Sequence, residues 1–176
     1  MKYLKGLLTA CVILSLMIFM SCGNGKKTTP DPEGKLTGEQ LSAGTWTPQA
    51  GGVTVGGTPR SEWDNFTLSF TVNTTSFEGG SYSTTGVPTD DGASDVWRTS
   101  GSWEFLKDSE GNVVVPTNTI IRDGDDSVPV TVNVDVVLDD EGNATGDGQL
   151  TLSFTIPAPE GRVAGFDGPW VFTFDL

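Results

Sequence analysis

Carboxylates and tryptophans are the side chains of this 176-residue sequence whose types and placement could do chemistry. Two carboxyl groups hydrolyse a glycosidic bond when the pKa of one is raised, so that this group acts as the acid. Glu62 and Glu104 are the best candidates, because each is adjacent to a tryptophan. Most other acids fall in segments typical of exposed turns, where carboxyl groups keep ordinary pKa values. A hydrolase is therefore only a second alternative, and we expect no enzyme and no catalytic residues.

The five tryptophans are the candidates for a binding surface. Trp46, Trp103 and Trp170 fall in predicted strands, which favours a place in the core. Trp63 and Trp97 fall near loops, where an exposed ring can stack on a sugar or enclose an apolar ligand. These two are therefore the candidate ligand-binding residues. The simpler interpretation is that each ring folds back onto the core as a lid.

Two absences in the composition exclude several kinds of site. The sequence has no histidine, and its only cysteines are Cys11 and Cys22. Ser-His-Asp triads, Cys-His nucleophiles and zinc sites built from Cys or His are therefore excluded. The acidic segments DGDDS (123–127) and DDEGNATGD (139–147) offer hard oxygen ligands, but neither fits a calcium-binding loop. We expect no metal and no cofactor.

The N-terminal segment predicts an export signal. Lys2 and Lys5 precede an uncharged apolar run of 14 residues (7–20), and Ser21 and Cys22 follow it. A bilayer core needs about 20 apolar residues, so the run has the length of a secretory signal instead. The small residue before the cysteine resembles the lipobox of bacterial lipoproteins. This resemblance implies cleavage before Cys22 and a lipid on its sulfur; the alternative is an ordinary cleaved signal.

The chain then divides into a signal peptide (1–21), a flexible tether (22–40) and a single domain (41–176). The tether is rich in Gly, Thr, Pro and Lys, without apolar periodicity. Two or more acyl chains anchor a protein stably, so we expect the lipidated N-terminus to hold the protein at a membrane of the bacterial cell envelope. No acidic run follows Cys22, which favours a periplasm-facing domain over one on the cell surface.

The charge of the chain limits its partners. The formal net charge is −13, and loss of Lys2 and Lys5 with the signal brings it to −15. Such a charge repels the phosphates of nucleic acids and anionic lipid head groups. We therefore expect no nucleic-acid partner, and a monomer whose acidity serves solubility.

Alternation of apolar and polar residues indicates an all-β domain. Four segments alternate strictly, which is typical of strands with one buried and one wet face: 65–74, 127–138, 148–156 and 169–176. Weaker strands are predicted at 44–48, 80–86, 101–107 and 112–122, the last broken at Pro116. No 12-residue window shows a helical stripe. Acidic, glycine-containing turns at 108–112, 123–126 and 139–143 suit antiparallel hairpins.

About eight antiparallel strands in this length predict either an up-and-down barrel or a β-sandwich. A closed barrel leaves no exposed edge strand. Pro129, inside the long strand 127–138, can lie only at an edge or at a bulge, because proline donates no hydrogen bond to a neighbouring strand.

Two motifs and the order of features resemble those of bacterial lipocalin-like lipoproteins. "AGTWTP" places Trp46 in a G-x-W motif, and "GRVAGFDGPWVFTFDL" places Arg162 ahead of the last strand. In lipocalins such a tryptophan closes the barrel floor and a basic residue stacks on it; Arg162 departs from the family by preceding the strand. The resemblance implies non-catalytic binding of a small apolar or amphipathic ligand inside the barrel. The alternative is an accessory module that binds glycan or protein through exposed Trp63 and Trp97.

Overall fold

The structure, a computed structural model, describes residues 32–90, 92–158 and 166–176, with side chains described from residue 35 onward. Cys22 and Arg162 therefore lie outside the described residues. The elements are α2 (Pro32–Leu41), β1 (Thr45–Val55), β2 (Thr58–Pro59), η1 (Ser61–Trp63), β3 (Thr67–Val72), β4 (Gly79–Thr85), α3 (Ala93–Val96), β5 (Ser100–Phe105), β6 (Thr119–Arg122), β7 (Asp125–Asp135), β8 (Gln149–Ile156) and β9 (Gly168–Asp175).

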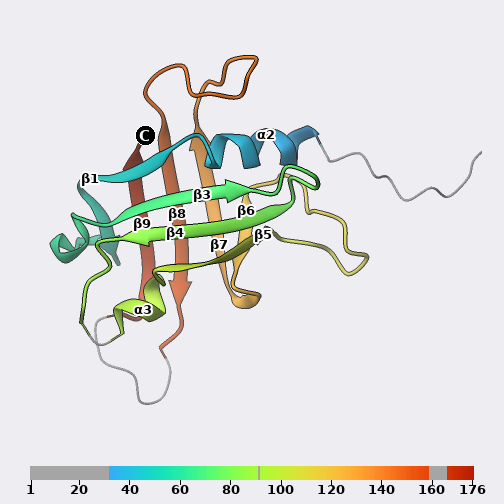
Figure 1. The fold of residues 1–176 in the computed structure, drawn as a ribbon. Helices are drawn as coiled ribbons and strands as arrows, with labels where there is room; N and C mark the ends of the chain where they lie inside the picture. The colour runs from blue at the N-terminus through green and yellow to red at the C-terminus, as the bar shows by residue number, and fades with distance from the viewer. Residues whose placement is uncertain (1–31, 91, 159–165) are drawn as a thin grey trace, which may run out of the picture.

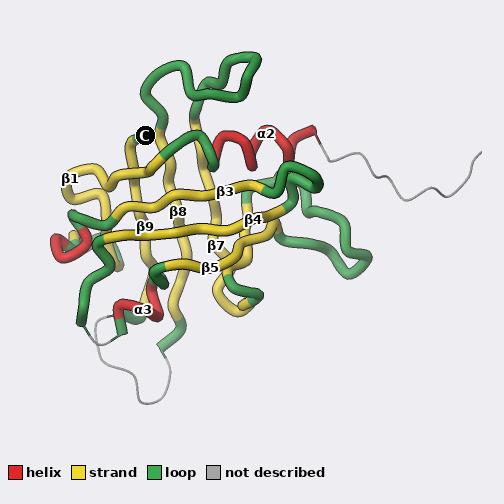
Figure 2. The backbone as a smooth tube through the Cα atoms, viewed as in Figure 1, coloured by secondary structure: helices red, strands yellow, loops and turns green. Residues whose placement is uncertain are grey.

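The strands form an up-and-down β-barrel, as predicted. Each strand from β3 to β9 pairs antiparallel with the next one along the chain, β1 pairs with β3, and β1 also pairs with β9. This last pairing closes the sheet, so the sandwich alternative is wrong (Figures 1 and 2). The two-residue β2 pairs only with the end of β1 and stays outside the closed ring. The result is an eight-stranded, lipocalin-like barrel.

The four strictly alternating segments correspond to β3, β7, β8 and β9. In β8 every second residue from Leu150 to Ile156 is buried, which is the pattern that alternation predicts. Two weaker predictions differ in length from the observed strands. β1 continues to Val55, with a register shift between Pro48 and Val53 that absorbs its glycines. The segment 112–118 is not a strand, and β6 begins only at Thr119.

Pro129 lies at an irregularity in the pairing, as its chemistry requires. The register between β6 and β7 shifts between the pairs Ile120–Val130 and Arg122–Asp125, and the pairing of β7 with β8 begins only at Thr131. The proline therefore replaces no hydrogen-bonded position of a regular ladder.

Residues 32–40 of the predicted flexible tether (22–40) belong to helix α2, which begins at Pro32, whereas residues 22–31 lie outside the described residues. Proline suits a first helical position, where its missing N–H costs nothing. The helix is held by tertiary contacts: Gln40 Nε2 donates to the carbonyl oxygen of Val136 at 2.7 Å, and Trp46 Nε1 donates to that of Leu41 at 2.8 Å. It thus caps one end of the barrel (Figure 1). Within the described ranges, no helix is both long and apolar enough to cross a membrane.

Aromatic side chains fill the barrel interior. Phe172 lies at the centre of the cluster, with its ring 5.4–6.0 Å from those of six neighbours: Trp63, Phe66, Trp97, Phe154, Trp170 and Phe174. The predicted core tryptophans Trp46, Trp103 and Trp170 are at most 2% exposed, which confirms their assignment. An eight-stranded barrel is just wide enough to be filled by its own side chains. The interior, where the lipocalin resemblance places the ligand, is therefore occupied by this cluster.

Candidate functional site

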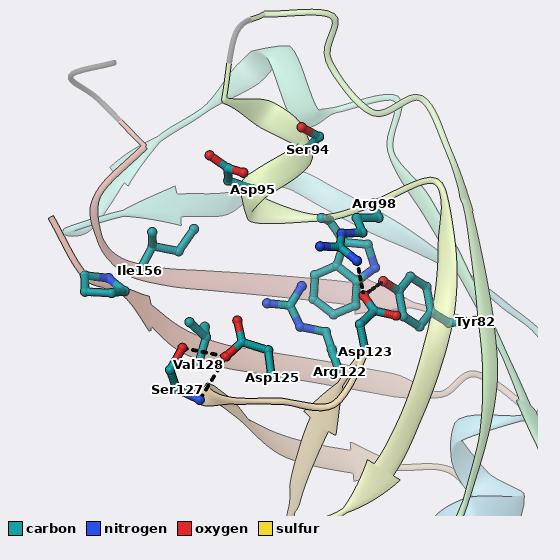
Figure 3. Close-up of a pocket in the computed structure, with 12 residues that line it drawn as sticks. Tyr82, Ser94, Asp95, Arg98, Arg122, Asp123, Asp125, Ser127, Val128 and Ile156 are labelled. Carbon is teal, nitrogen blue, oxygen red and sulfur yellow. Dashed lines mark hydrogen bonds and ion pairs between the residues drawn. The ribbon is translucent and has the colours of Figure 1, made fainter. Parts of the chain in front are cut away.

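A pocket of about 170 Å³ opens at the end of the barrel opposite to α2. Helix α2 contacts the residue just after β7, whereas the pocket is lined by the first residues of β7 and by α3. We call it the α3-end pocket (Figure 3). Its lining comes from β4, α3, β6, β7 and β8 and the residues that follow them: Tyr82, Ser94, Asp95, Trp97, Arg98, Arg122, Asp123, Asp125, Ser127, Val128, Ile156 and Pro157.

Arg122 is the buried cation of this pocket, with only 9% of its surface exposed. Its guanidinium carbon lies 4.1 Å from the ring centre of Trp97 and 4.7 Å from that of Phe154, so the cation packs on two aromatic rings. Nη1 donates to the carbonyl oxygen of Val96 at 2.8 Å, while Nε is buried without a hydrogen-bond partner among the described residues. Burial lowers the pKa of Arg122 to about 10, so the side chain is still cationic at neutral pH.

A tight hairpin positions Arg122. Arg122 and Asp125 face each other across the two-residue turn formed by Asp123 and Gly124, which have φ angles of 54° and 71°. Positive φ at both positions is typical of the turn that best joins two twisted strands, and Asp-Gly is a preferred sequence for it. The guanidinium is therefore carried by paired strands, with its aromatic support in the core beneath.

Asp123 is held by three partners at the side of the pocket. It accepts hydrogen bonds from the Tyr82 hydroxyl at 2.7 Å and the Ser102 backbone N–H at 2.9 Å, and Arg98 Nη1 lies 3.7 Å from Oδ2. Burial, and then the bond to Asp123, raise the pKa of Tyr82, so its hydroxyl stays protonated and donates. Gly101 leaves room for this network, because a Cβ there would meet Asp123 Oδ1 and the Tyr82 hydroxyl.

The opposite side of the pocket combines one bound carboxylate with an apolar wall. Asp125 accepts hydrogen bonds from the Ser127 hydroxyl at 2.5 Å and its backbone N–H at 3.0 Å, which lower the pKa of this carboxyl group. Val128, Ile156 and Pro157 supply the apolar surface. None of the ion pairs among the described residues involves Arg122, so each nearby carboxylate is engaged elsewhere or exposed.

The two candidate ligand-binding tryptophans differ in place. Both Trp63 and Trp97 are 0% exposed, which confirms the simpler interpretation that each ring folds back onto the core, and the alternative of rings presented to solvent is wrong. Trp63 packs on Phe66, Trp170 and Phe172 without lining the pocket. The ring of Trp97 packs against the guanidinium of Arg122, and Trp97 lines the pocket. The reason is burial: loop aromatics of this size stabilise most when covered.

The candidate catalytic carboxylates Glu62 and Glu104 both lie outside the α3-end pocket. Glu62 Oε1 accepts a hydrogen bond from Arg60 Nε. Glu104 lies on β5, where Lys107 Nζ is 3.5 Å from it, and its side chain is 51% exposed. Each is therefore paired with a basic side chain, Glu104 sharing Lys107 with Glu78, and neither lines the α3-end pocket.

The acidic turns use their carboxylates to hold the chain. Asp108 accepts hydrogen bonds from the backbone N–H groups of Glu110 and Asn112 at 2.9 Å each, and Asp139 accepts the equivalent bonds from Glu141 and Asn143. The bond from the asparagine N–H is the main cause that lowers the pKa of each aspartate. Ordinary pKa values in these turns were expected, so that expectation is wrong. Within the described residues no group of three or more acids, cysteines or histidines could hold a metal ion.

We expect Asp108 and Asp139 to titrate below 3.8, the ordinary value. A lowered folded-state pKa stabilises the turn above the ordinary pKa, and this stabilisation is lost as the pH falls through the lowered value. Carboxyl-detected NMR titration measures both midpoints, and Asn143→Ala should raise that of Asp139 part of the way by removing one side-chain donor. Midpoints at or above 3.8 in the unaltered protein would contradict this account of the turns.

Sequence reasoning missed Arg122 as a functional residue. The signal was a lone cation at the end of the apolar segment Thr119–Arg122, next to an Asp-Gly turn. The other residues that line the pocket are spread along the chain from Tyr82 to Pro157, so no local sequence motif connects them with Arg122.

The fold and the pocket define the class of this protein: a closed, eight-stranded lipocalin-like β-barrel with a solid aromatic core and a small polar pocket at one end. Comparison of the chain with protein-family models, with curated proteins and with solved structures gave no match. Its function is therefore argued from the site alone.

Proposed function

We propose that this protein is a lipid-anchored, non-catalytic binding protein of the bacterial cell envelope that takes a small ligand in the α3-end pocket. The observation that carries the proposal is the buried guanidinium of Arg122 at the base of that pocket. A buried cation without an ion-pair partner costs stability, so a fold keeps one most readily where a ligand uses it. The closed barrel is the scaffold that holds the guanidinium in place.

The position of α2 supports an orientation for the proposed anchor. The chain enters the barrel through α2, and the pocket lies at the opposite end. A lipid on Cys22 would therefore tether the α2 end and leave the pocket facing away from the membrane. A net charge of −15 after signal removal agrees with a monomer that keeps clear of anionic lipid and does not bind nucleic acid.

Cys22→Ser tests the anchor. We expect the unaltered protein to incorporate radiolabelled palmitate and to sediment with membranes, and the variant to lose both properties, because the sulfur is the attachment point. Cys11→Ser is the matched control and should change neither. Palmitate incorporation that survives in Cys22→Ser would contradict lipid attachment at this residue.

The pocket is tested with the Cys22→Ser protein, which carries no lipid on residue 22. A panel of small amides, alcohols, amines and carboxylates is titrated while backbone and side-chain NMR signals are followed. The proposal expects at least one compound to shift signals around the α3-end pocket saturably and without chemical change. If no compound shifts these signals, the proposed binding function is wrong; turnover of a compound would contradict the non-catalytic reading.

The other two functions lose support from the same geometry. A glycan- or protein-binding module was motivated by exposed Trp63 and Trp97, and both are buried. A hydrolase was motivated by Glu62 and Glu104, and each of these is paired with a basic side chain outside the pocket. We therefore propose neither.

A further inference from the structure

The N–H donors of Arg122 limit which chemical class of ligand the α3-end pocket can bind. This inference rests on the proposed function and adds a substrate class to it. A guanidinium has five N–H donors in a rigid fork. Nη1 is used by Val96, while Nε is covered by neighbouring atoms and has no partner among the described residues, so a ligand that moves these neighbours finds the edge formed by Nε and Nη2 unused. That edge matches the two oxygens of a carboxylate, which accept parallel hydrogen bonds from it.

The acids near Arg122 do not take this role. Asp123 is engaged by Tyr82, Ser102 and Arg98, and Asp125 is engaged by Ser127. Asp95, on α3, is exposed. In Figure 3 the guanidinium of Arg122 points toward the side of the pocket on which Asp125 lies, with Ile156 farther away on that side. The charge of Arg122 is therefore offset at a distance, and no carboxylate among the described residues forms an ion pair with it.

The size and the far wall of the pocket select among anions. A volume of about 170 Å³ has room for several water molecules or one small ligand. Val128, Ile156 and Pro157 form an apolar wall, which suits a short alkyl chain better than a fully hydrated inorganic anion. Long acyl chains do not fit, because the aromatic cluster around Phe172 fills the barrel behind the pocket.

We propose that the α3-end pocket binds a short-chain organic carboxylate. Its carboxylate accepts hydrogen bonds from the free edge of Arg122, and its alkyl group lies against Val128, Ile156 and Pro157. No covalent step is involved. The bound anion compensates the buried cation, which makes the ligand-bound protein more stable than the ligand-free one.

Propionate and its uncharged isostere propionamide test the proposal on the Cys22→Ser protein without altering the pocket. We expect propionate to shift the Arg122 Nε–Hε signal saturably and to raise the melting temperature, and propionamide to bind at least about tenfold more weakly, since a hydrogen bond to a charged group is worth that much. Inorganic phosphate should also bind more weakly than propionate. Equal binding of propionamide or phosphate would overturn carboxylate recognition while leaving the α3-end pocket a binding site.

Two variants assign the effect to Arg122. Arg122→Gln should weaken propionate binding at least about tenfold, whereas Lys107→Gln, which removes a cation that lies outside the pocket and pairs with Glu78 and Glu104, should change it less than about threefold, because exposed ion pairs contribute little. If Arg122→Gln does not fold, Val128→Phe replaces it: the larger ring fills the pocket without touching the Arg122 bonds and should abolish binding. Propionate binding that persists undiminished in Arg122→Gln, or in Val128→Phe where that variant replaces it, would overturn the proposal.

Discussion

Phe172→Ala should lower the free energy of unfolding by about 3–5 kcal/mol, the range found for a buried phenylalanine removed from a core. Phe172 is 0% exposed and its ring contacts six other aromatic rings, four of which come from elements other than β9. The cavity left behind cannot close easily, because the neighbours are themselves fixed by strand pairing. Urea denaturation monitored by circular dichroism measures the change.

Val137→Ala is the matched control for this prediction. Val137 is 70% exposed, so its truncation should change the free energy of unfolding by less than about 0.5 kcal/mol. A loss below about 1 kcal/mol for Phe172→Ala would mean that the barrel interior is not closely packed. In that case the interior would again be a place for an apolar ligand.

Trp97→Ala should cost about 3–5 kcal/mol and also abolish propionate binding. Trp97 has two roles: its ring packs on Phe66, Tyr82, Phe154 and Phe172, and it supports the guanidinium of Arg122 at 4.1 Å. Removing the ring lets the guanidinium move and admits water beneath it. Chemical denaturation gives the stability, and NMR titration at a temperature where the variant is folded gives the affinity.

Trp63→Ala separates the two roles. Trp63 is as buried as Trp97, so its replacement should lower the free energy of unfolding by a similar amount. The three aromatic rings that Trp63 contacts all lie in the core, and none of them lines the α3-end pocket. Propionate affinity should therefore change less than about threefold, well short of the tenfold that a lost charged hydrogen bond gives. If both alanine variants are too unstable, the phenylalanine variants Trp97→Phe and Trp63→Phe are compared instead. Equal loss of binding in the two would show that Trp97 has no special part in the site.

The barrel was predictable because its strands alternate. Apolar residues at every second position, such as Leu150, Leu152 and Phe154, lie on one buried face when the segment is a β-strand. Short turns between such segments favour antiparallel pairing of neighbouring strands. Pro129 was predictable for the same reason, since a missing N–H restricts where a proline can lie. Closure into a barrel rather than a sandwich depends on β1 reaching β9, which lies far away in the sequence.

Helix α2 was not predictable from its own residues. It is 10 residues long and mostly polar, and among its described side chains (35–41) the fully buried apolar one is Leu41. Isolated helices of this length are marginal in water. The helix is stabilised by the barrel end that it covers, through Gln40 and Trp46, and such tertiary contacts leave no periodic signal in the sequence.

The α3-end pocket was not predicted, because the sequence patterns that indicate binding or catalytic residues here are loop tryptophans and acids next to tryptophans, and Arg122 belongs to neither group. Arg122 resembles an ordinary strand-end cation in the sequence, and only folding places it on Trp97 and Phe154. Trp97 was a candidate for the right kind of role but for the wrong reason, because it acts from beneath the pocket instead of at a loop tip.

The most direct test of the account is the position of bound propionate, mapped by NMR signal changes across the Cys22→Ser protein. The account predicts saturable shifts at the Arg122 Nε–Hε group, the Trp97 indole and Val128, with little change at Trp46 and Trp103 near α2. Shifts centred on Trp46 and Trp103, or no saturable shift at Arg122, would contradict a ligand site built on the buried cation.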